Sequence, residues 1–302
     1  MFENFQYNIF VRIIPPVINR IMFLLIPLMT WRSHRRVYNH MKQWQNLQDT
    51  LSDIQKSPFS LPFKNTIPYT TIAILIGTIL ILIPLKPYFD IEIAASSSIL
   101  SYLFLGETVI FVALYWLTNC LFVALVARNI VTLINQSITS KNEDSLMKLV
   151  DFWVKLYDWN AEFPSTASIT FLINVLNMIV TMVTCLYAFT FLIFVEEDKS
   201  ASLAYFTCTI ISFLILLIFC ESSNLVLNQI GRLTHVCLLT TDTKEMNPRI
   251  LKVILIFIQT IETKQPKIMM NGIMIISRSS LISISATIIN FLIVLKQFNP
   301  LG

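Results

Sequence analysis

Hydrophobic residues fall into long runs separated by polar connections. A helix needs roughly 20 apolar residues to cross the hydrocarbon core of a bilayer, and six runs are long enough to do so. They cover residues 11–31, 67–86, 96–127, 167–195, 203–228 and 271–296. The pattern predicts six membrane-spanning helices, and therefore an all-α, polytopic transmembrane bundle.

The polar connections alternate in length and in charge. Those at 32–66, 128–166 and 229–270 are long and carry most of the arginines and lysines, whereas the two short turns are mainly acidic. Because Lys and Arg resist translocation, we predict that the long connections are cytoplasmic. With six spans, both ends of the chain would then be extracellular.

Two stretches of the long connections have helical patterns of their own. The apolar periodicity of the third run continues from Leu133 to Leu156, which predicts a helix extending into the cytoplasm with a face that needs a partner. Residues 247–262 are apolar but too few to span a membrane comfortably. We expect them to form a buried cytoplasmic helix packed against that extension.

Composition supports a lipid environment. The chain is 55% hydrophobic and 13% charged, with a mean hydropathy of +0.68, whereas soluble domains carry about 25% charged residues. Its five glycines form no phosphate-binding loop and are few for a transporter with broken helices. No cleavable signal peptide is evident at the first apolar run.

The residues that usually carry catalysis or bind metals form no recognisable group. The five cysteines lie in or beside apolar runs, and the three histidines lie in polar connections, without the spacing of a zinc site. There is no Ser-His-Asp or His-Glu-x-x-His pattern. We therefore predict that the protein is not an enzyme and needs no cofactor or metal.

A basic segment, residues 31–36 (WRSHRR), directly follows the first apolar run. Such clusters can bind nucleic acid, but one that adjoins a membrane span is explained more simply by contact with anionic lipid of the inner leaflet. We expect membrane lipids, and no nucleic acid, among the partners.

The end of the chain carries the most specific motif. Asn290-Phe291, five mostly apolar residues and then Gln297-Phe298 resemble the last-helix signature of insect gustatory receptors, in which Thr-Tyr, five hydrophobic residues and Gln-Phe follow one another. The preceding segment also resembles that family, and the specific similarity covers about 45 residues. The chain departs from the pattern at Asn290-Phe291, at Arg278 and Lys296, and in having six rather than seven predicted spans, with the first helix missing.

The resemblance implies a chemosensory subunit of a ligand-gated, non-selective cation channel in the plasma membrane, opened by a small-molecule tastant. Related receptor subunits would form a homo- or hetero-tetramer joined by cytoplasmic helices, with the last helix of each lining the pore. Residues 1–246 would be the bundle with the ligand pocket, and residues 247–302 the anchor helix and pore helix. The implied pore and gate residues are Gln297, Phe298, Val294, Ile293, Asn290 and Ala286.

The resemblance also implies a ligand pocket that opens outward among the earlier helices. Its candidate residues are Glu107, Tyr115, Trp116, Tyr187 and Tyr205. Each of them can equally be a packing residue or part of an interfacial aromatic belt. Likewise, Gln297 and Lys296 can reach the headgroups as ordinary anchors at the end of a span.

Two other functions stay open. The missing first helix, Lys296 and Arg278 favour a shortened, non-conducting relative that modulates partner subunits. A G-protein-coupled receptor fits less well, because six spans and an external C-terminus do not match that class and the chain lacks Asp-Arg-Tyr and Asn-Pro-x-x-Tyr elements.

Overall fold

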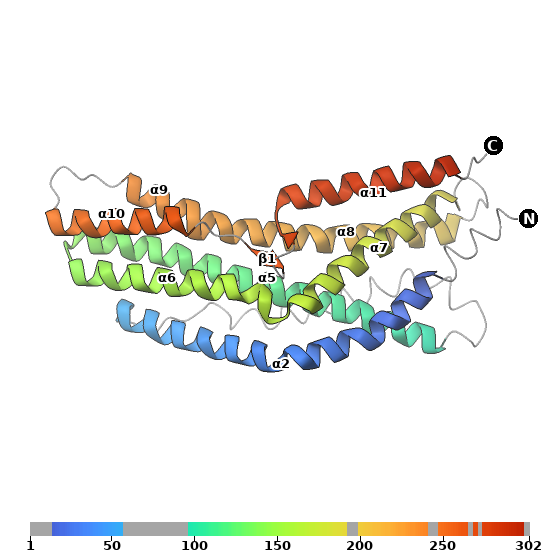
Figure 1. Cartoon of the computed structure of the whole chain (residues 1–302), viewed down its shortest axis with the longest axis horizontal. Helices are drawn as coiled ribbons and strands as arrows, with labels where there is room; N and C mark the ends of the chain where they lie inside the picture. The colour runs from blue at the N-terminus through green and yellow to red at the C-terminus, as the bar shows by residue number, and fades with distance from the viewer. Residues whose placement is uncertain are drawn as a thin grey trace, which may run out of the picture.

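The computed structural model describes residues 14–56, 96–191, 199–240, 247–264, 268–270 and 274–298, which form an elongated helical bundle (Figure 1). A single two-stranded hairpin interrupts the helices of the described residues. The elements are α2 (Ile14–Gln55), α5 (Ser96–Thr139), α6 (Glu143–Thr166), α7 (Ser168–Phe191), α8 (Lys199–Leu227), η5 (Asn228–Leu233), α9 (Thr234–Leu239), α10 (Pro248–Thr263), β1 (Met269–Met270), β2 (Met274–Ile275) and α11 (Arg278–Phe298).

Two halves follow one another along the long axis of the bundle (Figure 1). We call the part that contains α7, α8 and α11 the membrane half, and the part that contains α6, α9 and α10 the extension half. Helices α2 and α5 run through both (Figure 1). Helix α2 begins and α11 ends at the same end of the bundle, in the membrane half (Figure 1).

Among the described residues, three helices are long and apolar enough to cross a membrane: Thr108–Thr139, Ser168–Thr190 and Tyr205–Leu239. A shorter apolar helix covers Arg278–Val294. These helices overlap four of the predicted spans, and a fifth, 11–31, falls largely within α2. The predicted span 67–86 lies outside the described residues. The total of six spans and the side on which the termini lie stay predictions.

The third span extends beyond residue 127 as predicted, but its helix ends at Thr139, and the rest of the predicted extension forms a separate helix. Helix α5 ends at Thr139, and the chain turns through Lys141, whose φ is 53°. The Asn142 side chain then caps α6 by accepting a hydrogen bond from the Ser145 backbone N–H at 3.0 Å. Capping and the acidic first turn stabilise a new helix start. The amphipathic stretch therefore folds back onto α5 and α2.

The predicted connection 32–66 is also helical as far as Gln55, because α2 continues through it. Apolar residues at helical spacing on this part of α2 are buried, including Trp44 and Leu51. They face α6 and α5. A polar sequence with one apolar stripe therefore forms a helix here rather than a loop.

Helix α10 confirms that residues 247–262 form a helix packed against the predicted extension, because it contacts α6, and it also contacts α9. Its cytoplasmic location stays a prediction. Asn247 caps its start, with its side-chain oxygen 3.0 Å from the Arg249 backbone nitrogen. Phe257 is fully buried and meets the Trp153 ring edge-on, at 5.8 Å between centroids. The short helix is thus stabilised by burial in the extension half.

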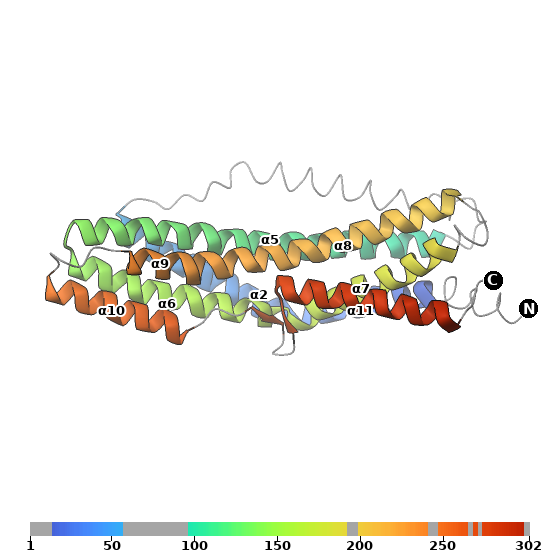
Figure 2. The same cartoon turned by 90° about the horizontal axis from the view of Figure 1, so that it is seen from above.

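The last helix starts late because a hairpin precedes it. Met269 pairs with Ile275 and Met270 with Met274, and the Ile276 N–H donates to the Ile268 carbonyl at 3.1 Å. The hairpin contacts α6 and α7 near the middle of the bundle (Figure 2). The predicted span 271–296 therefore begins only at Arg278, at the boundary between the two halves.

Candidate functional site

The start of α11 is fixed by local hydrogen bonds. Ser277 precedes the helix, and its hydroxyl oxygen lies 3.4 Å from the Ser280 backbone nitrogen that donates to it. Its carbonyl accepts from the Leu281 N–H at 3.3 Å. A serine at this position satisfies N–H groups that have no partner within the helix, so the pore-helix candidate has a defined first turn.

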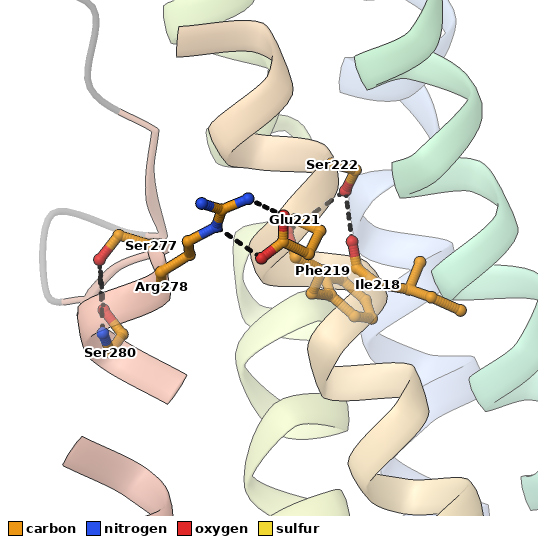
Figure 3. Close-up of polar contacts among 7 residues, drawn as sticks. All are labelled: Ile218, Phe219, Glu221, Ser222, Ser277, Arg278 and Ser280. Carbon is orange, nitrogen blue, oxygen red and sulfur yellow. Dashed lines mark hydrogen bonds and ion pairs between the residues drawn. The ribbon is translucent and has the colours of Figure 1, made fainter. Parts of the chain in front are cut away.

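An ion pair joins that first turn to α8. The Arg278 guanidinium donates through Nε to Oε1 and through Nη2 to Oε2 of Glu221, both at 2.7 Å (Figure 3). Two parallel hydrogen bonds fix the relative orientation of the two groups as well as their distance. A cation at a helix N-terminus is unfavourable with the helix dipole, and the carboxylate offsets that effect.

One face of α11 packs on the bundle. Leu281, Ile284 and Leu292 are partly buried against the core, and Ile288 is buried. Their spacing of three or four residues forms one stripe on a helix, and α11 contacts α7 and α8. Helix α11 is therefore attached to its own chain along a single side.

The opposite face of α11 is small and polar. By helical geometry, at about 100° per residue, five exposed positions lie within about 30° of a line facing away from the packed stripe. We call them the outer stripe: Ser279, Ser283, Ala286, Asn290 and Gln297. Ile282 and Ile289 lie on one side of it, so polar groups occupy the centre of the exposed face and aliphatic groups its margin.

The predicted pore residues map onto this face in part. Ala286, Asn290 and Gln297 belong to the outer stripe, while Ile293 and Val294 lie about 50° to either side of its centre and are exposed. The side chain of Phe298 lies outside the described residues. A face turned toward lipid would be apolar throughout, because polar groups in hydrocarbon cost free energy. The outer stripe is therefore suited to water or to another helix.

The predicted pocket residue Trp116 lies in the core. It is 0% exposed, and its Nε1–H donates to the Ser223 hydroxyl at 3.2 Å. Three phenylalanine rings surround it at centroid distances of 4.8 to 5.3 Å: Phe163, Phe171 and Phe219. They come from α6, α7 and α8, so this indole joins four helices rather than lining an open cavity.

Of the remaining predicted pocket residues, Tyr115 packs against two of the rings that surround Trp116, whereas Tyr187 lies farther along α7. Tyr115 stacks on Phe171 at 6.2 Å, with its hydroxyl near Thr166 and Asn119. Tyr187 lies 16 positions beyond Phe171 on α7, about 24 Å along the helix at 1.5 Å per residue.

Tyr205 and Glu107 are the other two. Tyr205 is half-buried near the start of α8, which pairs closely with α7. Glu107 lies on α5, and its side chain is outside the described residues. The structure thus separates the candidates into an inner pair, Tyr115 and Trp116, and an outer pair, Tyr187 and Tyr205, and the pocket stays a prediction.

Sequence reasoning missed two features of this site. The serines of the outer stripe, Ser279 and Ser283, follow the same helical spacing as Ala286 and Asn290 and could have been found on a helical projection. The pairing of Arg278 with Glu221 had a weaker signal: each is a charge at the end of an apolar run. Their separation of 57 residues left the contact undetermined.

Comparison with known protein families gives a match over almost the whole chain. Residues 2–301 match the model of the family described as 7tm chemosensory receptors. A comparison with curated proteins finds no match.

Proposed function

Since the chain belongs to the 7tm chemosensory receptor family, we propose that this chemoreceptor is a subunit of a tetrameric, ligand-gated, non-selective cation channel in the plasma membrane, opened by a small-molecule tastant. Homo- and hetero-tetramers with related receptor subunits both fit this proposal.

The arrangement of α11 carries the proposal. The helix packs on its own chain through Leu281, Ile284, Ile288 and Leu292, and it turns the outer stripe away from that chain. Around a symmetry axis, four such stripes would place hydroxyl and amide groups along a shared path, where they replace part of the hydration shell of a cation. The aliphatic margins would seal neighbouring copies against lipid.

A route for gating follows from α8. Phe219 touches the aromatic cluster around Trp116, and Glu221, two residues later, holds Arg278 at the start of α11. In this proposal a ligand that displaces the cluster moves this turn of α8, and the ion pair transmits the movement to the pore helix.

Assembly would use the extension half. Leu255 and Ile256 on α10 are 57% and 47% exposed, and Leu239 on α9 is 59% exposed. If this half lies in the cytoplasm, as predicted, adjoining exposed apolar residues favour burial against a partner. We propose that this surface meets the neighbouring subunits.

A non-conducting subunit is the second candidate, favoured by the lysine at position 296. Four cations beside a pore would repel the permeant ion. In the register of α11, however, position 296 falls about 110° from the centre of the outer stripe, in line with Arg278. This placement favours a conducting subunit.

Cysteine accessibility tests the pore assignment. We expect Ala286→Cys and Asn290→Cys, in protein reconstituted into lipid, to react with a charged, membrane-impermeant thiol reagent. Ile289→Cys is the matched control, because Ile289 is 56% exposed in the single chain but lies about 90° from the stripe centre. The parent chain reports any reaction of the five native cysteines.

In cells that express the chain, the same reagent should reduce the current of Ala286→Cys and Asn290→Cys and leave Ile289→Cys unchanged. Equal reactivity at all three positions would remove the pore assignment. The cysteines of the outer stripe could react selectively while the chain gives no current, either alone or with related subunits. That result would favour the non-conducting candidate.

A further inference from the structure

A hollow lies between α2 and the start of α7. It is shallow, because its enclosed volume is only about 10 Å³, roughly the room that one water molecule needs, so a larger group would lie over it and not inside it. Its lining includes Met29, Arg32, Ser33 and Arg36 from α2, and Ser168 and Thr170 from the first turn of α7. Arg32 and Arg36 are one helical turn apart and both line the hollow, whereas Arg35, between them, does not.

The walls of this hollow are held in place by contacts between α2 and α6. The Trp159 Nε1–H donates to the His40 carbonyl at 3.0 Å, and the two rings stack at 4.2 Å. One turn earlier, Arg36 Nη1 donates to the Ser165 carbonyl at 3.5 Å. The arginines are therefore presented on a packed helix and not on a loose terminus.

The charge of the hollow is positive and uncompensated within the described part of the chain. There, the ion pairs are His235–Glu262, Lys264–Asp158 and Arg278–Glu221, and none includes Arg32 or Arg36. The N-terminus of α7 adds the positive end of a 24-residue helix dipole. Two guanidinium groups, serine and threonine side chains and a helix N-terminus are a set of groups that favours a phosphate anion.

The surface beside the hollow is apolar on one side only. Helix α7, which is apolar and long enough to cross a membrane, begins at Ser168. On α2, Ile21 and Leu28 precede the arginines and are 49% and 65% exposed, and Trp31, directly before Arg32, is 86% exposed. A ligand that contacts both the arginines and the neighbouring apolar surface needs an anionic headgroup and acyl chains. A phospholipid has both, whereas a free phosphate ion has no acyl chains.

We propose that the headgroup of an anionic phospholipid binds over this hollow, with Arg32 and Arg36 on its phosphate and its acyl chains along α2 beside Leu28. The site anchors the junction of α6 and α7 at the membrane surface. This assignment stands apart from the channel proposal, because it concerns the binding of lipid and not conduction.

The test uses the purified full-length chain in a neutral detergent. Its thermal unfolding midpoint is followed while short-chain phosphatidylserine, short-chain phosphatidylcholine or inorganic phosphate is added, because a ligand that binds only the folded state raises the midpoint. We expect phosphatidylserine to raise the midpoint, phosphatidylcholine to raise it much less, and inorganic phosphate to leave it unchanged.

Variants locate the site. Replacing both arginines (Arg32→Gln with Arg36→Gln) should weaken the apparent affinity for phosphatidylserine by about five-fold per arginine, or roughly 25-fold in total. Arg35→Gln is the matched control, with the same charge change on the same helix outside the hollow, and should weaken the apparent affinity clearly less than Arg32→Gln does. Arg32→Gln alone, with an expected five-fold loss, replaces the double variant if removal of the Arg36 contact lowers the midpoint without lipid.

Three results would overturn the proposal. An equal loss in Arg35→Gln would mean that only the general positive field attracts the lipid. Equal stabilisation by phosphatidylcholine would mean that the charge is not recognised. Equal stabilisation by inorganic phosphate would reduce the hollow to a site for small anions.

Discussion

Helices α6 and α7 have the same length, 24 residues each, and follow one another through Ala167, yet their outward faces are opposite in character. The outward face of α6 is charged, with Asp151, Lys155, Asp158 and Glu162 all exposed at helical spacing. The outward face of α7 is apolar, with exposed Ile169 and Leu176. This change of character is the one expected where the surroundings of a helix change from water to lipid.

Their inward faces are alike. Trp153 and Phe163 of α6 and Phe171 and Val175 of α7 are all at most 2% exposed and belong to one continuous core. The residues on the inward face of a helix therefore depend on the helices that it packs against, and those on the outward face depend on the surrounding solvent. The boundary at Ala167 also lies beside the proposed lipid site.

The two halves should also differ in what stabilises them. In the extension half, burial removes apolar surface from water, which is the dominant favourable term in folding. In the membrane half, lipid is as apolar as the side chains, so packing and hydrogen bonds remain. Changes in the extension core are therefore expected to have the larger effects on unfolding.

The largest expected effect is that of Trp159→Ala. This indole is 4% exposed and bridges α6 and α2, and the loss of a buried tryptophan costs about 3–5 kcal/mol of unfolding free energy. Trp31→Ala is the control, because Trp31 is 86% exposed. Thermal unfolding of detergent-solubilised protein measures both, and similar midpoints for the two variants would contradict the assignment of this core.

A smaller effect concerns acid. His40 is 2% exposed, neither ring nitrogen has a hydrogen-bond partner among the described residues, and burial lowers its pKa from 6.5 to about 4. The unfolded chain binds a proton on this imidazole below pH 6.5 and the folded chain does not, so stability falls as the pH drops from 6.5 toward 4. At pH 5 the loss from this group is about 2 kcal/mol relative to pH 7.

His40→Phe should remove this part of the acid sensitivity while keeping an aromatic ring against Trp159. The measurement is the unfolding midpoint at pH 7 and pH 5 for both proteins. The exposed His34 provides the control, since His34→Phe should leave the acid sensitivity unchanged. If the unfolding midpoint of His40→Phe fell between pH 7 and pH 5 by as much as that of the parent, other groups would cause the acid sensitivity.

The smallest effect on stability is expected for the ion pair at the boundary, because Glu221 and Arg278 are 41% and 65% exposed in their side chains and exposed pairs contribute little. Its removal should instead change channel opening. Glu221→Gln and Arg278→Gln should each shift the dependence of the current on ligand concentration in the same direction. The double variant should shift it no further than either single variant, and exchange of the two charges should restore it in part. Additive shifts would show that the two residues act separately.

Much of the fold could be predicted because it depends on local pattern. The length of the apolar runs predicted helices α5, α7 and α8, and the closing motif predicted the family. The exposed side of α11 could also be placed in advance, since Asn290 and Gln297 are seven residues apart and share a helix face. None of these three predictions required knowledge of contacts between residues that are distant in the sequence.

The rest depended on contacts between distant segments. Periodicity continues through residues 140–142, so only the turn at Lys141 and the cap at Asn142 show that α6 folds back. The pairing of Glu221 with Arg278, the burial of Trp116 and the hollow beside Arg36 all require elements that are far apart in the chain to lie side by side. The spacing of residues along a sequence shows which face of a helix is apolar, but it does not show which other element that face packs against.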